Sequence, residues 1–232
     1  MRPRASWHPW VMVGPSVLVL VTFFVVPVLV AAYQSFFSWD LLTEPAYVGV
    51  SNYEKLLVSG EALALVGRTL KYSALVVTLA MGLGLGLALA LNRPGRWVAF
   101  VRSAVFSAYV VSWVSVALLW MWILDADAGL GAAIARGLGF SRVGFLTDPN
   151  VALTTLGIVT VWKITGYAMV IFLVGLQDVP PALLEAAALD GAGPVARFRH
   201  VIWPLLRPTA AFVATTSLIV SFQAFDVIRV MT

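Results

Sequence analysis

Long apolar stretches alternate with shorter polar ones along this chain. A transmembrane helix needs about 20 consecutive apolar residues, and five stretches approach or exceed that length. They lie at about 10–33, 70–91, 103–124, 151–176 and 204–225. The pattern predicts an all-α, polytopic bundle of transmembrane helices in which 1–232 form a single domain. The first stretch is longer than the hydrophobic region of a signal peptide and lacks a clear cleavage site, so we expect it to remain as a span.

The composition supports the prediction of a membrane protein and argues against several other classes of protein. The chain is 61% hydrophobic and 11% charged, whereas soluble domains carry about 25% charged residues. Its net charge of +4 is scattered among apolar runs, which argues against a nucleic-acid-binding face. With no cysteine and two distant histidines, the sequence predicts neither a disulfide nor a metal site.

The basic residues also predict an orientation. One set of polar segments carries eight Lys or Arg residues: 1–9, 92–102 and 177–207. The alternate set carries six: 34–71, 125–150 and 226–232. The positive-inside rule places the first set, and with it the N-terminus, in the cytoplasm. A cysteine introduced at Ser51 or Ser141 would then face the outside.

The glycine-rich part of the second stretch does not resemble a phosphate-binding loop. Gly82, Gly84 and Gly86 do not make GxGxxG, and nothing in the chain matches GxxxxGK[ST]. Gly82 and Gly86 are four residues apart, which puts them on one helix face where a neighbouring helix can approach closely. We predict a helix-packing role for these two glycines.

The polar stretch 180–208 predicts two short helices with a bend between them. Pro181 suits the first turn of a helix, and the alanines and leucines after it favour helix. Asp190 and Gly191 then interrupt the run. Pro194 can open a second helix, and Pro204 is expected to begin the last span.

This stretch resembles the EAA loop of permease subunits in bacterial binding-protein-dependent ABC importers. The matching residues fall at the family's spacing: Glu185, Ala186, Ala187, Asp190, Gly191, Ala192, Phe198, Ile202 and Pro204. The segment YVGVSNYEKLL at 47–57 is also similar to the loop after the first span in carbohydrate-type importers. The alternative interpretation of 180–208 is an ordinary amphipathic loop.

The resemblance implies a type I importer permease of the bacterial inner membrane, similar to the maltose and glycerol-3-phosphate permeases, with a coupling loop at 180–203. It implies a heterodimer with a second EAA-type permease, two cytoplasmic ATPase subunits that bind ATP and Mg, and an extracytoplasmic solute-binding protein. This chain would bind no cofactor and would not itself be an enzyme. The last residues resemble the start of an extracytoplasmic loop, so a sixth span is expected beyond Thr232.

Two other classes of membrane protein are alternatives, and each would need different sequence features. A secondary transporter needs ion-coupling residues inside its spans, and Lys163 is the conspicuous charged residue there. A membrane assembly subunit that does not transport would need no coupling loop.

Lys163 lies near the middle of the fourth span, where a charge costs at least ~2.5 kcal/mol. It is about twelve residues, or roughly 18 Å, from each end of the span, which is too far for its ammonium to reach the interface. Its helix face also carries Thr160 and Tyr167. Two similar pairs occur on other spans: Tyr109 with Trp113, and Ser217 with Ser221.

We expect these seven side chains to line a pathway for a polar solute. The alternative is structural: Ser and Thr can bond to their own helix, and aromatic residues can anchor interfaces.

Overall fold

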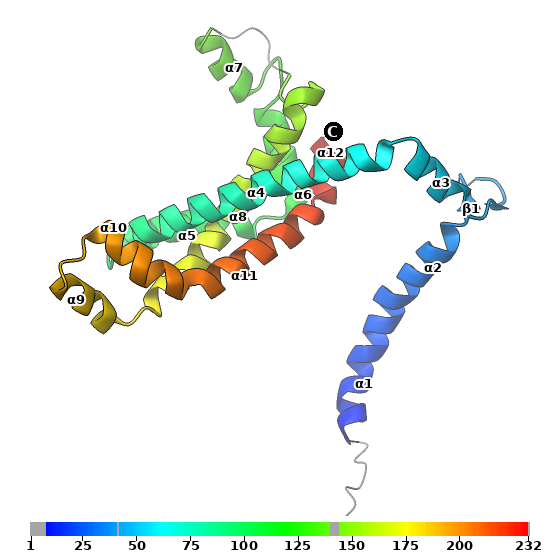
Figure 1. The fold of residues 1–232 in the computed structure, drawn as a ribbon. Helices are drawn as coiled ribbons and strands as arrows, with labels where there is room; N and C mark the ends of the chain where they lie inside the picture. The colour runs from blue at the N-terminus through cyan, green and yellow to red at the C-terminus, as the bar shows by residue number, and fades with distance from the viewer. Residues whose placement is uncertain (1–7, 41, 140–143, 232) are drawn as a thin grey trace, which may run out of the picture. The chain divides into compact units, whose positions relative to one another are not determined.

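The computed structural model describes residues 8–40, 42–139 and 144–231, and most of these residues are helical (Figure 1). The chain divides into two compact units, 1–66 and 67–232. Within the described residues, four helices are long and apolar enough to cross a membrane, and a bent pair of helices can count as a fifth span. The predicted all-α, polytopic fold is therefore confirmed.

The first unit contains one long apolar helix and a small polar subdomain. The helix consists of α1 (His8–Leu20), the π-helical turn η1 (Val21–Val25) and α2 (Val26–Gln34). It matches the first predicted span closely. Almost all of its described side chains are exposed, and none is buried within the chain.

The polar subdomain is folded by hydrogen bonds from side chains to the backbone. β1 (Phe37–Ser38) pairs antiparallel with β2 (Ala46–Tyr47), and α3 (Ser51–Val58) follows. The side-chain amide of Asn52 donates to the carbonyls of Ser35, at 2.9 Å, and Phe37, at 3.0 Å. These bonds attach the start of α3 to the C-cap of α2 and to β1.

The turn between the strands is organised by Asp40. Its carboxylate accepts hydrogen bonds from the Thr43 hydroxyl and from the backbone N–H groups of Leu42 and Thr43. The Thr43 hydroxyl is the main cause that lowers the pKa of Asp40 to about 2. Asp40 is therefore ionised at every physiological pH, and the turn stays intact.

The second unit is built around the helix α8. Its elements are α4 (Glu61–Leu91, which begins in the first unit), α5 (Arg96–Val110), α6 (Trp113–Ile123), α7 (Leu130–Gly137), α8 (Pro149–Gln177), α9 (Pro181–Leu189), α10 (Pro194–Arg197), the π-helical turn η2 (Phe198–Ile202), α11 (Trp203–Phe222) and α12 (Phe225–Met231). α8 buries 15 of its 29 residues, and α4, α5 and α11 lie along it (Figure 1). α12 packs on α6 and α8.

Close contact between α4 and α8 depends on a stripe of small residues. Ala80, Gly84 and Ala88 are four residues apart and buried, and a Cβ added at Gly84 would lie 2.6 Å from the Cβ of Ala168. Lipid is as apolar as the helices themselves, so close packing rather than the hydrophobic effect holds such helices together. Gly84 permits that packing.

Gly82 and Gly86, which the sequence predicts to pack against a helix, meet no helix among the described residues of this chain. No atom lies within 4 Å of a Cβ added at either glycine. Both series, 80/84/88 and 82/86, repeat every four residues, so the spacing alone did not tell which face meets α8. The buried face belongs to Gly84.

Two predicted boundaries need correction. The third span was expected as one helix over 103–124, but α5 ends at Val110, α6 begins at Trp113, and the two are bent by 100°. Residues 225–231, expected to begin a loop, form the helix α12. The second and fourth predicted spans lie within α4 and α8, which are longer at one or both ends.

Pro204 does not begin the last span. The helix runs without interruption from Pro194 through η2 and α11 to Phe222. A proline ring clashes with the carbonyl four residues before it, and a π-helical turn widens the helix at that point. The N–H of Trp203 bonds to the carbonyl of Phe198, five residues back. The N–H of Val26, just before Pro27, bonds to Val21 in the same way.

Gly84→Val tests the packing of α4 on α8. The added side chain would press on Ala168, so we expect a loss of about 1–3 kcal/mol in stability, as for other overpacked cores. Gly86→Val is the matched control, because it adds the same side chain to the same helix in open space. Thermal unfolding in detergent measures both. An equal loss at Gly86 would mean that this face also packs against a helix, as the spacing predicts.

Candidate functional site

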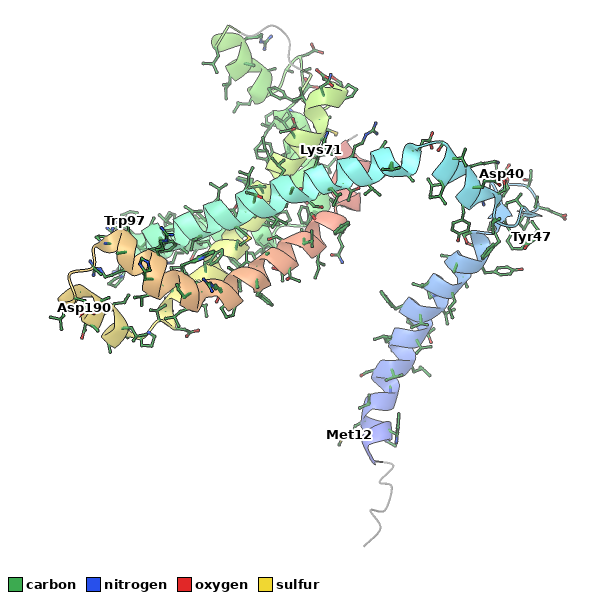
Figure 2. All side chains as sticks on the ribbon, viewed as in Figure 1. Met12, Asp40, Tyr47, Lys71, Trp97 and Asp190 are labelled. Carbon is green, nitrogen blue, oxygen red and sulfur yellow. The ribbon has the colours of Figure 1, made fainter. Side chains whose placement is uncertain are left out.

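The segment 180–203 forms the helical hairpin that the sequence predicts. α9 ends at Leu189, with Asp190, labelled in Figure 2, as its C-cap, and the backbone of Gly191 has a φ of +79°. The N–H of Ala192 bonds to the carbonyl of Ala187 at 2.9 Å, which closes the end of α9. Left-handed backbone at this position suits glycine, because a Cβ would clash with the neighbouring carbonyl. The chain then re-enters helix at Pro194.

The hairpin presents both carboxylates and apolar side chains to its surroundings. Glu185 on α9 and Asp190 at the bend are exposed, as is Ala186. Leu189 is 90% exposed and Val195 is 80% exposed. Apolar side chains beside charged ones are typical of a surface that meets another protein.

The second helix of the hairpin is joined to α11. Phe198 is partly buried, and its ring lies 6.2 Å from the ring of Trp203. The Nε of Arg197 is buried with no hydrogen-bond partner among the described residues. Pro204 is close to the start of α11, directly after η2. The predicted motif residues therefore occupy one hairpin that continues into a membrane helix.

A second group of predicted residues lies inside the bundle. Thr160 is fully buried, and its hydroxyl shares a 2.7 Å hydrogen bond with the hydroxyl of Tyr72. Ser221 is buried and donates to Ser73 at 2.9 Å, and Ser217 is buried as well. The first bond joins α4 to α8, and the second joins α11 to α4.

Lys163 is also buried, with 1% of its surface exposed. Its ammonium donates to the carbonyls of Ala108 and Tyr109, both at 3.2 Å, and to that of Val111. It also lies 4.8 Å from the centre of the Trp113 ring, a cation–π distance. Lys163 therefore binds the broken end of α5.

Three predicted pathway side chains remain partly exposed. The rings of Tyr109 and Tyr167 are stacked with their centres 4.8 Å apart, and Trp113 stands at the start of α6. α5 approaches α8 closely here, because a Cβ added at Gly166 would meet the carbonyl of Val105 and lie 2.8 Å from the Cα of Phe106. Of the seven side chains predicted to line a pathway, these three, the aromatic group, are the ones that keep exposed surface within this chain.

Several partners in this group were not found from the sequence. Tyr72 and Ser73 lie on α4, far in sequence from Thr160 and Ser221. The acceptors of Lys163 are backbone carbonyls, which no side-chain pattern reveals. The sequence does contain one signal for the start of α6. Ser112 is a residue type that favours the N-cap position, and its hydroxyl accepts a hydrogen bond from the N–H of Ser115. Ser141, expected on the outside, is not among the described residues.

Comparison with solved structures shows the same fold. A chain of a bacterial ABC transporter involved in the import of the acidic polysaccharide alginate matches with a TM-score of 0.78 and 23% identity, over 96% of this chain and 77% of that one. A second structure, of the alginate transporter with its alginate-bound periplasmic protein, matches with a TM-score of 0.74 and 23% identity, over 91% and 71%.

Comparison of sequences shows the family. The permease proteins UgpA of the sn-glycerol-3-phosphate transport systems of Brucella abortus and Rhizobium meliloti are each 32% identical, over 97% of this chain and 77% of theirs. Residues 82–232 match the family model described as "binding-protein-dependent transport system inner membrane component". Spans, fold and relatives agree with the predicted permease. This chain therefore belongs to the binding-protein-dependent inner membrane components and is a multi-pass permease subunit of an ABC importer.

Proposed function

We propose that this permease forms one half of a pathway for a sugar or glycerol-phosphate solute. Two observations support this class of solute. The relatives at 32% identity are named for sn-glycerol-3-phosphate, and the structural neighbours for an acidic polysaccharide. The chain itself offers a stacked pair of tyrosines and a tryptophan within its spans, and such rings suit a solute that carries both C–H faces and hydroxyls.

The hairpin 180–203 is proposed to couple the spans to a partner ATPase in the cytoplasm. The observation that carries this proposal is the exposed surface of Glu185, Leu189 and Val195 on a hairpin that runs directly into α11. A movement imposed on the hairpin reaches the membrane helix without an intervening loop. The proposed assembly contains a second permease, two ATPase subunits that bind ATP and Mg, and an extracytoplasmic solute-binding protein.

Glu185→Ala tests the coupling role. We expect solute uptake to fall by about tenfold or more, because an exposed carboxylate can form a charge-assisted hydrogen bond to a basic residue of the ATPase. Glu61→Ala is the matched control, since Glu61 is also an exposed glutamate on a helix and lies outside both motif segments. Uptake and solute-stimulated ATP hydrolysis are measured in proteoliposomes. If Glu185→Ala has wild-type uptake and wild-type stimulated ATP hydrolysis, the Glu185 carboxylate does not couple the hairpin to the ATPase.

Gly191→Val tests the bend of the same hairpin. The φ of +79° is strained for any residue with a Cβ, so the bend should change shape and stimulated ATP hydrolysis should fall. Gly193→Val is the control, because Gly193 has an ordinary φ of −69° and open space around it. Solute binding to the isolated binding protein should be the same in all cases. If the two variants behave alike, the left-handed turn has no role in coupling.

Single cysteines test the orientation, because the chain has none of its own. Ser51→Cys should react with an impermeant thiol reagent in intact cells. Ala99→Cys and Ala188→Cys should react only after the membrane is opened, since both lie in segments that the positive-inside rule places in the cytoplasm. The reverse labelling pattern would overturn the proposed topology.

Tyr167→Ala tests the aromatic group. It removes the ring that stacks on Tyr109, so we expect uptake to fall by about fivefold to tenfold while basal ATP hydrolysis changes little. Trp97→Ala is the control, because Trp97 is a highly exposed aromatic residue near the start of α5. Equal uptake by both variants would mean that the tyrosine pair only packs α5 on α8.

A further inference from the structure

The break in the third span does not lie at a proline or a glycine. Residues 96–124 contain neither proline nor glycine, which are the usual causes of a sharp kink in a helix. Yet α5 and α6 are bent by 100°, and Val111 between them has extended backbone. Ser112 caps the start of α6 locally, whereas the freed end of α5 needs contacts from elsewhere in the fold.

A broken helix leaves carbonyl groups without N–H partners at its C-terminal end. In water these groups would be hydrated, but inside a membrane each unsatisfied group is costly. The carbonyls at the end of α5 also carry the negative end of the helix dipole. A positive group with several donors is the natural partner for this position.

Lys163 supplies such a group. A lysine ammonium has three N–H donors, and the structure gives it three carbonyl acceptors, on Ala108, Tyr109 and Val111. A neutral amine has only two N–H donors, so the geometry calls for the charged form. The Trp113 ring, at the start of α6, covers the same ammonium. One side chain thus binds both sides of the break.

We infer that Lys163 is a positioning residue that keeps the third span broken by acting as a tethered cation at the end of α5. Its donors are used by the backbone, so its role is to hold other groups in place rather than to contact the solute. The carbonyl of Tyr109 is one of its acceptors, and the Tyr109 ring stacks on Tyr167. Lys163 therefore sets where the aromatic group lies. This inference concerns the shape of the span and does not depend on which solute is carried.

The distance across the break gives a direct test. Spin labels at Ala99→Cys and Leu119→Cys flank it, and both positions are exposed. At 1.5 Å per residue, straightening the span would lengthen this distance by on the order of 10 Å. Pulsed electron–electron spin resonance on the assembled importer, with reactive cysteines of its partners replaced, measures the distance. A second label pair at Thr154→Cys and Val174→Cys, both on α8, should not change.

We expect Lys163→Met to lengthen or broaden the Ala99–Leu119 distance, because the carbonyls lose their donors while the side-chain length is kept. Lys163→Arg, which keeps the charge, should stay closer to the wild type, and Lys163→Gln should fall between them. Thr165→Val is the control on α8: it removes a buried hydroxyl that bonds only to Val161 in the structure, at 2.6 Å, and should leave the distance unchanged.

Uptake provides the second readout. Lys163→Met should lower uptake by about tenfold or more with little change in basal ATP hydrolysis, since the aromatic group loses its position while the hairpin does not. If Lys163→Met does not assemble, Lys163→Gln and Lys163→Arg carry the same comparison. A wild-type distance in both neutral variants would overturn the inference and assign the break to the Ser112 cap and packing alone.

Discussion

The backbone carbonyls at the end of α5 impose the strictest requirement in this fold. Inside a membrane a helix can be interrupted only where other groups satisfy its freed hydrogen bonds. Here the donor is Lys163 on α8, and its neighbours are arranged around that contact: Gly166, one turn further on, lets α5 approach, and Tyr167 stacks on Tyr109. A lysine that looks costly in the sequence becomes the partner that the break requires.

Other polar groups in the bundle are paired across helices in the same way. The bond from Tyr72 to Thr160 joins α4 to α8, and the bond from Ser221 to Ser73 joins α11 to α4. In the membrane such bonds contribute about 1 kcal/mol each, so their main effect is to select one arrangement of helices among several apolar alternatives. Together with the small-residue stripe at Gly84, they fix how α4 lies on the bundle.

Periodicity and hydropathy were sufficient to predict the class of fold, four of the spans and the hairpin with its bend at Gly191. They failed where the cause lies in another part of the chain. Between 96 and 124 only the N-cap type Ser112 hints at the break after Val110, and the lysine that holds the end of α5 lies on another helix. The two sets of small residues on α4 look equivalent, and only contact with Ala168 distinguishes Gly84 from Gly82. Pro204 predicts the start of a helix, yet the π-helical turn η2 accommodates this proline inside a continuous helix.

The uninterrupted helix from Pro194 to Phe222 has a mechanical consequence. Its 29 residues span roughly 43 Å at 1.5 Å per residue, which is longer than the hydrocarbon core of a bilayer. A rigid rod of that length converts a tilt of about 10° at one end into a displacement of about 7 Å at the other, by the same helix geometry. The wide turn at η2 lies within the first third of this rod. Bending at η2, and at Pro208 inside α11, therefore limits how much of an angular motion at residues 194–197 reaches Ser217 and Ser221.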